Sequence, residues 1–513
     1  MVIFRQWLRG RRSFFSQTQA DSLLNSTISS TLSMNLQQLS MLFSGIPELT
    51  KRTFSLKTGQ KAAIVYMDGL VDKTSINTDI LRPLMFHEWN EKDFWESSVS
   101  IGSVKKIEKW VDIEQALLNG KSILLIDKQI VALEIDTPGW PQRSIEEPSV
   151  ESSLKGSHQG FTETASQNIA LIRRYISSRE LKIKECTIGL RSGTKLSILY
   201  LADVVNEDVI REIESRIHSL RIDTVLSTGE LAELIEDNSY TPFPQLRVTE
   251  RPDTVAHELL KGRAAVVVDR SPSVLIGPMN FSSFFHVIDD YNVRWILASF
   301  IRLLRFVAFF IAIFTPSIYI AMISFHYEVI PLKLLLTLEQ SREKIPFPPL
   351  LEAMFMELVL EMLREAGIRL PAPVGQTVGV VGGIIIGQAA VQAGLVSNVM
   401  VIVVAVTAVA SFIIPDLEMA GGIRIIRFPM MIISSLFGLI GIVLGMMIIS
   451  IHLLSLESLG SPYSSPLSPL HVSDLKDTFI RLPQRFLNKR PLSVKPQQLK
   501  RSRTPRKVGG KNE

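Results

Sequence analysis

The sequence GQTVGVVGGIIIGQ, residues 375–388, has a glycine at every fourth position and no charged residue. A glycine weakens a helix by about 1 kcal/mol relative to alanine. Four residues make slightly more than one helical turn, so the glycines lie on one stripe: Gly375, Gly379, Gly383 and Gly387. Because small residues let membrane helices approach closely, the stripe predicts a membrane helix that packs against another helix.

Three amide side chains accompany the stripe: Gln376, Gln388 and Gln392. An amide inside a bilayer seeks water or a protein partner rather than lipid. Two interpretations are open. The helix is tightly packed, or it is also part of a ring of subunits around a wet axis, where glycines would permit the small shifts that open a gate.

Uncharged segments surround this helix. No Asp, Glu, Lys, Arg or His occurs in 306–325, 370–415 or 428–451. A bilayer core of about 30 Å is crossed by about 20 apolar residues. We therefore expect an α-helical multi-span membrane domain over 286–460, with four spans at 303–325, 374–396, 398–415 and 428–452.

The polar part of this domain is an amphipathic helix near 349–366. Apolar residues repeat at helical spacing, and three acids lie mostly off that face: Glu352, Glu357 and Glu361. A central charge facing lipid costs about 2.5–3.5 kcal/mol, so we expect this helix at the interface or facing water. It is either a plain interfacial helix or the source of a carboxylate ring beside a cation pathway.

The ends of the chain indicate its orientation. The segment MVIFRQWLRGRRSFF, residues 1–15, does not have the pattern of a secretory signal, so we expect the front half to remain inside. Residues 461–513 are rich in Lys and Arg with Pro, Ser and Gln, which predicts a disordered tail. Lys and Arg gather on the cytoplasmic side, near anionic lipid of the bilayer, so we expect both ends there and an even number of spans. No aromatic residues alternate with these charges, and nucleic acid is not an expected partner.

The front half predicts an α/β soluble region of two related subdomains, at 55–150 and 165–285. Two pairs of segments in these subdomains can be aligned with each other. Residues 61–77 align with 195–211, and each predicts a strand and then an amphipathic helix. Residues 117–135 align with 259–277, and each predicts a helix, a glycine cap and a hairpin. Residues 151–164 are predicted to be a linker, and 1–54 to be loosely ordered.

Composition excludes several classes of site in this half. The single Cys186 allows no internal disulfide, and the histidines lack metal-ligand spacing. No Walker loop, dinucleotide fingerprint or nucleophile elbow is present, so we expect no enzyme, cofactor or metal. Four polar residues near helix ends are interpreted as caps and inter-subdomain ion pairs, or as contacts with a neighbouring subunit: Arg173, Arg174, Arg251 and Asp253.

Several segments resemble the A subunits of nutrient germinant receptors, the GerA family of spore-forming bacteria. They are YMDGLVDK (66–73), GFTE (160–163) with NIALIRR (168–174), TERPD (249–253), PFPPLLEAMFMELVLEMLREAGIRLP (346–371), VGQTVGVVGGIIIGQAAVQAGLVS (374–397) and Arg427–Pro429. The resemblance spans about 55–470. It departs locally, at KGSHQGF and at Asp269-Arg270, where the family pattern has RGPREGF-like residues and an Asp-Gly turn.

The resemblance implies a subunit of a receptor complex in the spore inner membrane. Its companions would be a transporter-like, nutrient-binding B subunit and a lipoprotein C subunit, and the A subunit would form a homo-oligomeric ring that passes ions. A secondary transporter component and a non-conducting scaffold are the alternatives. The absence of repeated membrane segments argues against the transporter.

Overall fold

The computed structural model describes residues 23–86, 103–139, 148, 151 and 155–501. Within helix α14 (Ala372–Gln392), eight side chains are also outside the description: those of 372–374, 376–378 and 380–381. The chain divides into two compact units. The first contains residues up to 235, 248–277 and 494–498, and the second contains 236–247, 278–493 and the residues from 499 onward.

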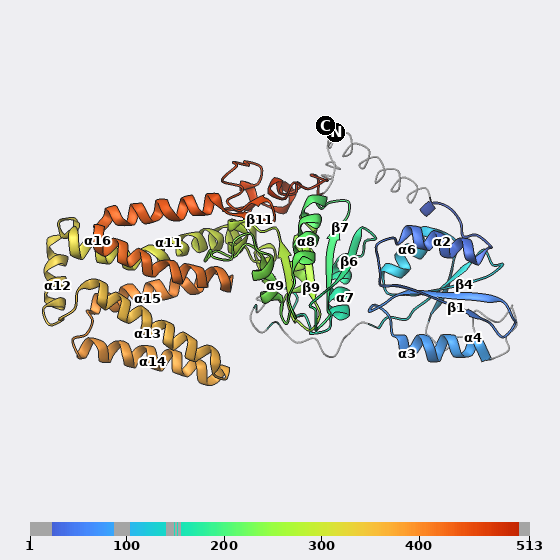
Figure 1. Ribbon diagram of the computed structural model, residues 1–513, viewed down its shortest axis with the longest axis horizontal. Coiled ribbons are helices and arrows are strands. Elements are labelled where there is room, and N and C mark those ends of the chain that lie inside the picture. Colours follow the sequence, from blue (N-terminus) through green and yellow to red (C-terminus); the bar gives the residue numbers. More distant parts are fainter. Residues whose placement is uncertain (1–22, 87–102, 140–147, 149–150, 152–154, 502–513) are drawn as a thin grey trace, which may run out of the picture. The chain divides into compact units, whose positions relative to one another are not determined.

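The first unit opens with a five-stranded antiparallel sheet in the order β1-β2-β4-β5-β3. Its strands are β1 (Leu49–Ser55), β2 (Lys61–Met67), β3 (Val104–Ile107), β4 (Ser122–Ile126) and β5 (Ala132–Ile135). Helices α2 (Leu32–Leu42) and α6 (Trp110–Leu118) cover one face, and α3 (Lys73–Ser75) and α4 (Arg82–Phe86), with the π-helical turn Ile76–Leu81, cover the other (Figure 1).

Strand β2 shows why this sheet is covered on both faces. Ala63, Val65 and Met67 enter one core, and the alternate residues Ala62, Ile64 and Tyr66 enter the other. Successive side chains of a strand point to opposite faces, so a run without polar residues needs two apolar layers around it. The sequence KAAIVYM therefore forms a central strand.

A second sheet in the same unit repeats this order, as β6-β7-β9-β10-β8. Its strands are β6 (Leu181–Ile188), β7 (Thr194–Leu201), β8 (Arg247–Thr249), β9 (Ala264–Val268) and β10 (Val274–Gly277). Its helices are α7 (Ala165–Tyr175), α8 (Glu207–Ser219), α9 (Thr228–Ile235) and α10 (Pro252–Leu260). The aligned sequence patterns therefore correspond to two copies of one topology, and glycine caps with positive φ follow α6 and α10 at Gly120 and Gly262.

The equivalence reaches individual hydrogen bonds. Asn35 and Asn168 each accept a backbone N–H from six residues earlier, at 3.0 and 2.8 Å, and donate back to the carbonyl of the same residue. Asp127 accepts the first N–H of α2 at 3.0 Å, and Asp269 accepts that of α7 at 3.4 Å. The first repeat therefore begins before residue 49, with α2.

The expectation of a loosely ordered segment over 1–54 is therefore wrong for its described part, 23–54. Helix α2 and strand β1 lie there, and Leu39, Leu42 and Phe43 are buried in the first core. The polar Ser, Gln and Asn residues of this segment hid a short amphipathic helix. Residues 1–22 lie outside the description.

The second unit is built from six helices within the described chain. They are α11 (Trp295–Phe325), α12 (Leu332–Arg342), α13 (Pro349–Arg369), α14 (Ala372–Gln392), α15 (Asn398–Ile413) and α16 (Leu417–Ser455). Among the described residues, α11 and α16 are long and apolar enough to cross a membrane, and α15 is a shorter apolar helix.

Helix α16 is folded back on itself at Gly438 (Figure 1). That glycine has φ 59° and ψ −139°, which no helical residue adopts. Arg247 lies 3.6 Å from Asp416 before the helix, and Ser458 beyond its end donates to the Gln245 carbonyl at 2.7 Å. Both ends of α16 therefore meet one loop, and the single predicted span at 428–452 is instead two antiparallel arms, 417–437 and 439–455.

The predicted disordered tail is also wrong over 461–501. This segment contains β12 (Ser461–Pro462), which pairs with β11 (Glu457–Ser458), and three 3-10 turns. Tyr463 and Arg481 are buried, and the Tyr463 hydroxyl donates to the Pro244 carbonyl at 2.7 Å. These partners lie far away in the sequence, so the basic composition of the tail did not reveal them. Residues 502–513 lie outside the description.

We expect Gly438→Ala to destabilise the helical unit. The backbone conformation at Gly438 is accessible to glycine almost alone and carries a penalty of about 1–3 kcal/mol for another residue. The added methyl group would also lie 2.7 Å from the His326 ring. Thermal unfolding of the purified protein in detergent should show a lower midpoint.

The matched control is Gly421→Ala, in the first arm of α16. A methyl group there meets only the Arg424 side chain, at 3.8 Å, an ordinary contact. This variant should unfold at the same temperature or higher, because alanine favours a helix. Equal stability of both variants would show that the bend at Gly438 does not depend on glycine.

Candidate functional site

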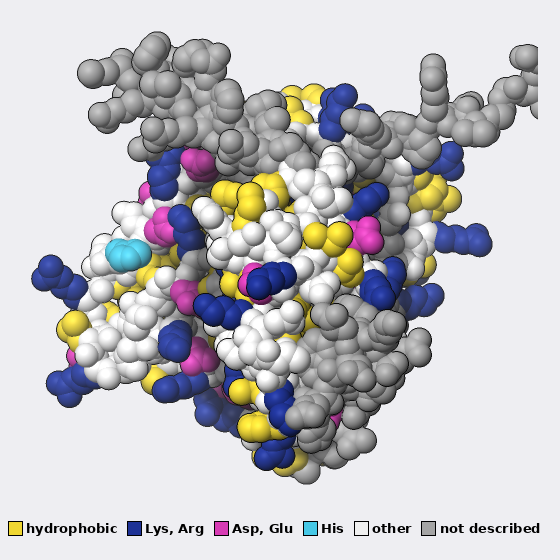
Figure 2. Space-filling model, turned by 90° about the vertical axis from the view of Figure 1, so that its right-hand side faces the viewer, with side chains coloured by type: hydrophobic (Ala, Val, Ile, Leu, Met, Phe, Trp, Pro, Cys, Tyr) yellow, Lys and Arg dark blue, Asp and Glu magenta, His cyan; other side chains and the backbone are white. Residues whose placement is uncertain are grey.

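The two units have different surfaces. The face shown in Figure 2, over the first repeat, mixes Lys and Arg with Asp, Glu and small hydrophobic areas, as expected for contact with water. Helix α13 of the second unit has the reverse distribution over residues 351–362. Glu352 and Glu357 are each 1% exposed, whereas large apolar side chains point outward: Leu351, Phe355, Leu358 and Met362. Charges inside and apolar side chains outside suit a helix surrounded by lipid.

Arg427 of α16 is the centre of the buried polar contacts. It forms an ion pair with Glu357 of α13 through Nη1, and its Nη2 donates to the Ser411 hydroxyl of α15 at 2.6 Å. Its Nε donates to the Ala312 carbonyl of α11 at 2.8 Å. One guanidinium therefore joins four helices.

Pro316 explains why the Ala312 carbonyl is available. In a helix that carbonyl would accept the N–H of residue 316, but proline has no N–H. Arg427 supplies the missing donor. The proline in α11 and the arginine in α16 therefore act together, although they lie 111 residues apart in the sequence.

The other two acids of α13 are paired as well. Glu352 lies 2.7 Å from Arg342 of α12 and accepts the Ser397 N–H at 3.0 Å. Glu361 lies 3.4 Å from Arg364 and 3.3 Å from Arg424 of α16. The three proposed cation-pathway acids thus have arginine partners in this chain. Glu352 and Glu357 do not face water as expected: they are buried, because these arginines neutralise their charges.

The glycine stripe of α14 is packed at its ends and open in the middle. A side chain at Gly375 would overlap Gly367 of α13, and one at Gly387 would meet Val401 of α15 at 3.8 Å. A Cβ at Gly379 or Gly383 would meet no other described atom within 4 Å. Gln388 and Gln392 are exposed, and the Gln376 side chain lies outside the description.

In the first unit, Arg173 is buried between the two repeats. Its Nη2 lies 3.0 Å from Glu48 of the first repeat and donates to the Leu181 carbonyl of the second at 3.1 Å. Arg251 pairs with Asp253 at 2.9 Å, beside the start of α10, and Arg174 is exposed. The structure therefore places Arg173 at an inter-repeat contact and the Arg251–Asp253 pair at a helix end.

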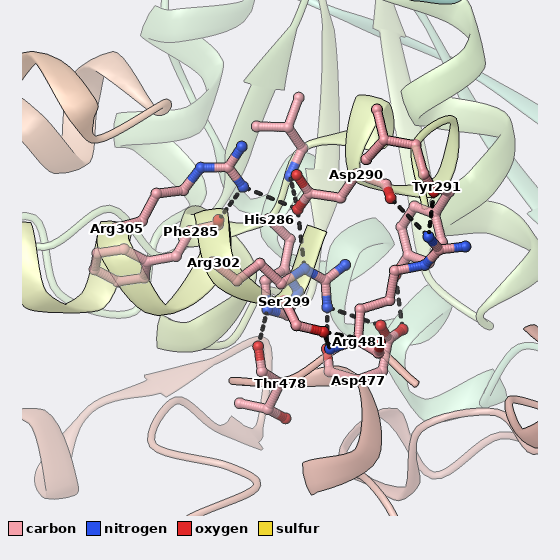
Figure 3. Close-up of polar contacts among 12 residues, drawn as sticks. Phe285, His286, Asp290, Tyr291, Ser299, Arg302, Arg305, Asp477, Thr478 and Arg481 are labelled. Atoms are coloured by element: carbon pink, nitrogen blue, oxygen red, sulfur yellow. Dashed lines mark hydrogen bonds and ion pairs between the residues drawn. The ribbon is translucent and has the colours of Figure 1, made fainter. Parts of the chain in front are cut away.

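Sequence reasoning missed a second polar cluster, shown in Figure 3. Arg302 of α11 is fully buried, with Nε 2.9 Å from Asp290 and Nη1 2.8 Å from Asp477. Arg481 donates to the Asp290 and Val293 carbonyls, both at 2.9 Å. The C-terminal segment is thereby fastened to the first turns of α11.

Tyr291 lies inside this cluster. Both guanidinium groups, of Arg302 and Arg481, lie over its ring, with carbon-to-centroid distances of 5.3 and 5.2 Å. Its hydroxyl donates to Asp477 at 2.7 Å, and burial together with that carboxylate raises the pKa of Tyr291 above its usual value. The sequence indicated the tail arginines only as orientation signals and did not indicate this cluster, because pairing of Arg302 with Asp290 leaves no local pattern.

The chain matches the family model described as the Bacillus/Clostridium GerA spore germination protein over residues 37–493. It is 42% identical over 437 residues to spore germination protein KA of Bacillus subtilis (strain 168), covering 84% of this chain and 80% of that protein. The membrane protein YfkQ of the same organism is 40% identical over 468 residues, covering 90% and 91%. This chain therefore belongs to the GerA spore germination family, as its sequence segments predicted.

A solved structure is also similar. The N-terminal domain of the A subunit of the Bacillus megaterium spore germinant receptor GerK3 is 31% identical, covering 50% of this chain and 98% of that one, with a TM-score of 0.39.

We expect Arg427→Met to destabilise the helical unit by about 3–5 kcal/mol, because it leaves Glu357 buried without a counter-charge. Adding Glu357→Gln to it should recover part of that loss. Thermal and denaturant unfolding of the three proteins in detergent would measure both effects.

Arg369→Met is the matched control. Arg369 also pairs with a glutamate of α13, Glu365, but both side chains are largely exposed. An exposed pair contributes about 0–1 kcal/mol, so this variant should unfold like the parent. Equal losses from both arginine variants would contradict the central role of Arg427.

Proposed function

We propose that this chain is the A subunit of a nutrient germinant receptor, embedded in the spore inner membrane. The observation that carries the proposal is the reversed polarity of α13 over residues 351–362, with paired charges inside and apolar residues outside. Family membership supports the role in germination. The nutrient-binding B subunit and the lipoprotein C subunit are its proposed partners.

Six helical segments cross the bilayer in this proposal: α11, α13, α14, α15 and the two arms of α16. Helices α13 and α14 have 21 residues each and are about 30 Å long, which matches the bilayer core, and α15, with 16 residues, is about 24 Å long. His326, after the end of α11, lies against Gly438, at the turn between the arms. That turn and the end of α11 are therefore placed on the outer side, and the even number of crossings keeps both ends of the chain on the cytoplasmic side.

The open middle of the glycine stripe supports assembly into a ring. Gly379 and Gly383 leave room for a helix from another copy, and the exposed Gln388 and Gln392 supply polar groups beside it. In this proposal α14 lines the ion path and the buried Arg427–Glu357 pair holds the surrounding helices in register. A non-conducting scaffold or a secondary transporter component remains the alternative function.

Cysteine labelling in intact cells tests the membrane arrangement. Phe437→Cys should react with an impermeant thiol reagent, because the proposal places it at the outer turn, whereas one straight span over 428–452 would bury it mid-membrane. Lys57→Cys and Lys500→Cys should be protected. All variants carry Cys186→Ser, although burial raises the Cys186 pKa to about 11 and already slows its reaction.

Protection of Phe437→Cys together with labelling of Lys57→Cys would overturn the arrangement. Labelling of the Lys57 and Lys500 variants only after the cells are made permeable confirms that the reagent can reach those positions.

Gly383→Leu tests the ring. A Cβ at position 383 meets no other described atom within 4 Å, so we expect the isolated subunit to keep its stability while the oligomer is overpacked, typically by about 1–3 kcal/mol per site. Spores should then contain less assembled receptor and respond poorly to nutrient. Crosslinking of spore membranes, with ion release measured beside it, would show both effects.

Gln388→Leu is the companion variant, because it removes an amide with little change in volume. If α14 lines the path, receptor abundance should stay normal while the rate or selectivity of ion release changes. Normal assembly and unchanged release in both variants would contradict the ring and favour the non-conducting scaffold.

A further inference from the structure

The last described residues of the basic tail fold into a hairpin. Residues 488–490 pair with 499–501: the Arg490 N–H donates to the Leu499 carbonyl and the Arg501 N–H to the Asn488 carbonyl, both at 2.8 Å. Both sides of this stem belong to the second unit, whereas the tip, residues 494–498, belongs to the first. We call residues 494–498 the strap.

The strap lies against the second repeat. The Gln497 N–H donates to the Val204 carbonyl at 2.8 Å. Pro496 lies beside Gly262, where an added Cβ would be 3.3 Å from the Pro496 side chain. Val494 and Pro496 are buried and the residue between them is exposed, so alternate side chains of the strap point into the protein.

The first repeat has an equivalent contact, made by a different part of the chain. There the Gly139 N–H donates to the Leu70 carbonyl at 3.1 Å. Leu70 and Val204 are equivalent residues, since each follows the second strand of its repeat and donates its N–H three residues back, to Met67 and Leu201. The strap therefore fills in the second repeat the position that residue 139 fills in the first.

The two segments differ in how they are held. Residue 139 comes shortly after β5, so the chain itself keeps it near the first sheet. The strap is distant in sequence from the second repeat and is placed by its contacts. Lys495 has φ 46°, an unfavourable conformation for a residue with a side chain, which detachment would relieve. A segment held by such contacts can open while the surrounding fold stays intact.

We propose that the strap is a releasable contact, which detaches from the second repeat while both units stay folded. Because the strap passes from the second unit to the first and back, its docked form restrains movement of the second repeat. Detachment removes this restraint. In the receptor role given under the proposed function, on which this last step rests, the docked strap favours the resting receptor and its detachment belongs to the response.

Thiol labelling of the purified full chain in detergent measures detachment. All variants carry Cys186→Ser. Val494→Cys places a thiol in the docked strap, Val266→Cys places one in the buried centre of β9, and Leu499→Cys places one on an exposed position of the stem. A maleimide should label Val494→Cys roughly tenfold more slowly than Leu499→Cys but far faster than Val266→Cys, because β9 is exposed only when the repeat unfolds.

Either of two results would overturn the releasable strap. Labelling of Val494→Cys as slow as that of Val266→Cys would make the strap a part of the cooperatively folded repeat. Labelling as fast as that of Leu499→Cys would mean that the strap is not docked.

Two variants of Gln497 test the backbone contact. Gln497→Pro removes the N–H that the Val204 carbonyl accepts, whereas Gln497→Ala keeps it and changes only an exposed side chain. Gln497→Pro should raise the labelling rate of Val494→Cys severalfold and leave that of Val266→Cys unchanged. Gln497→Ala should change neither rate. An equal effect of the two variants on Val494→Cys would contradict the contact.

The regulatory role is tested in spores whose other germinant receptors are deleted. The probe is a dilution series of a defined mixture of amino acids, sugars and nucleosides. At matched receptor abundance, Gln497→Pro spores should germinate at severalfold higher dilution than Gln497→Ala spores. An equal or lower limiting dilution for Gln497→Pro would overturn the role of the strap in the resting receptor.

The labelling result does not depend on germination, so the two proposals can fail separately. If deletion of this chain left the response of such spores to the mixture unchanged, the proposed receptor function would be contradicted, and the labelling rates would still decide whether the strap detaches.

Discussion

The helical unit depends on one buried guanidinium. Arg427 contacts α11, α13 and α15 from its position on α16, and two of these contacts, with the Ala312 carbonyl and the Glu357 carboxylate, satisfy groups that would otherwise be buried unpaired. A buried charge is tolerated only when its partners are in place, so these four helices have little freedom to shift separately. The Arg427–Glu357 pair is therefore stable only at one spacing of the four helices, and it holds the helices at that spacing.

The spacing of apolar residues was sufficient to predict those elements that leave a local pattern in the sequence. The apolar run KAAIVYM, the glycine caps at Gly120 and Gly262 and the helix near 349–366 were all visible as local patterns, and the structure contains each of them. The repeat was visible for the same reason. Strand β1 was missed, because an edge strand with polar residues lacks the apolar signal of its buried neighbour.

Long-range polar contacts could not be predicted in this way. Nothing near Arg302 in the sequence indicates that Asp477 lies 2.8 Å away, and the tail that supplies Asp477 has the composition of a disordered segment. The bend at Gly438 could not be predicted for a different reason. Two apolar arms with one glycine between them have the same hydropathy as one long span, and only the backbone angles distinguish them.

Helix α13 contacts both the buried arginines and the glycine stripe. Its acids bind arginines of α12 and α16, and Gly367 near its end lies against Gly375 of α14. A small rotation of α13 would change both sets of contacts together, since they belong to one helix. A shift of the buried ion pairs would then reach the glycine stripe, because α13 and α14 are joined by a short turn and pack directly.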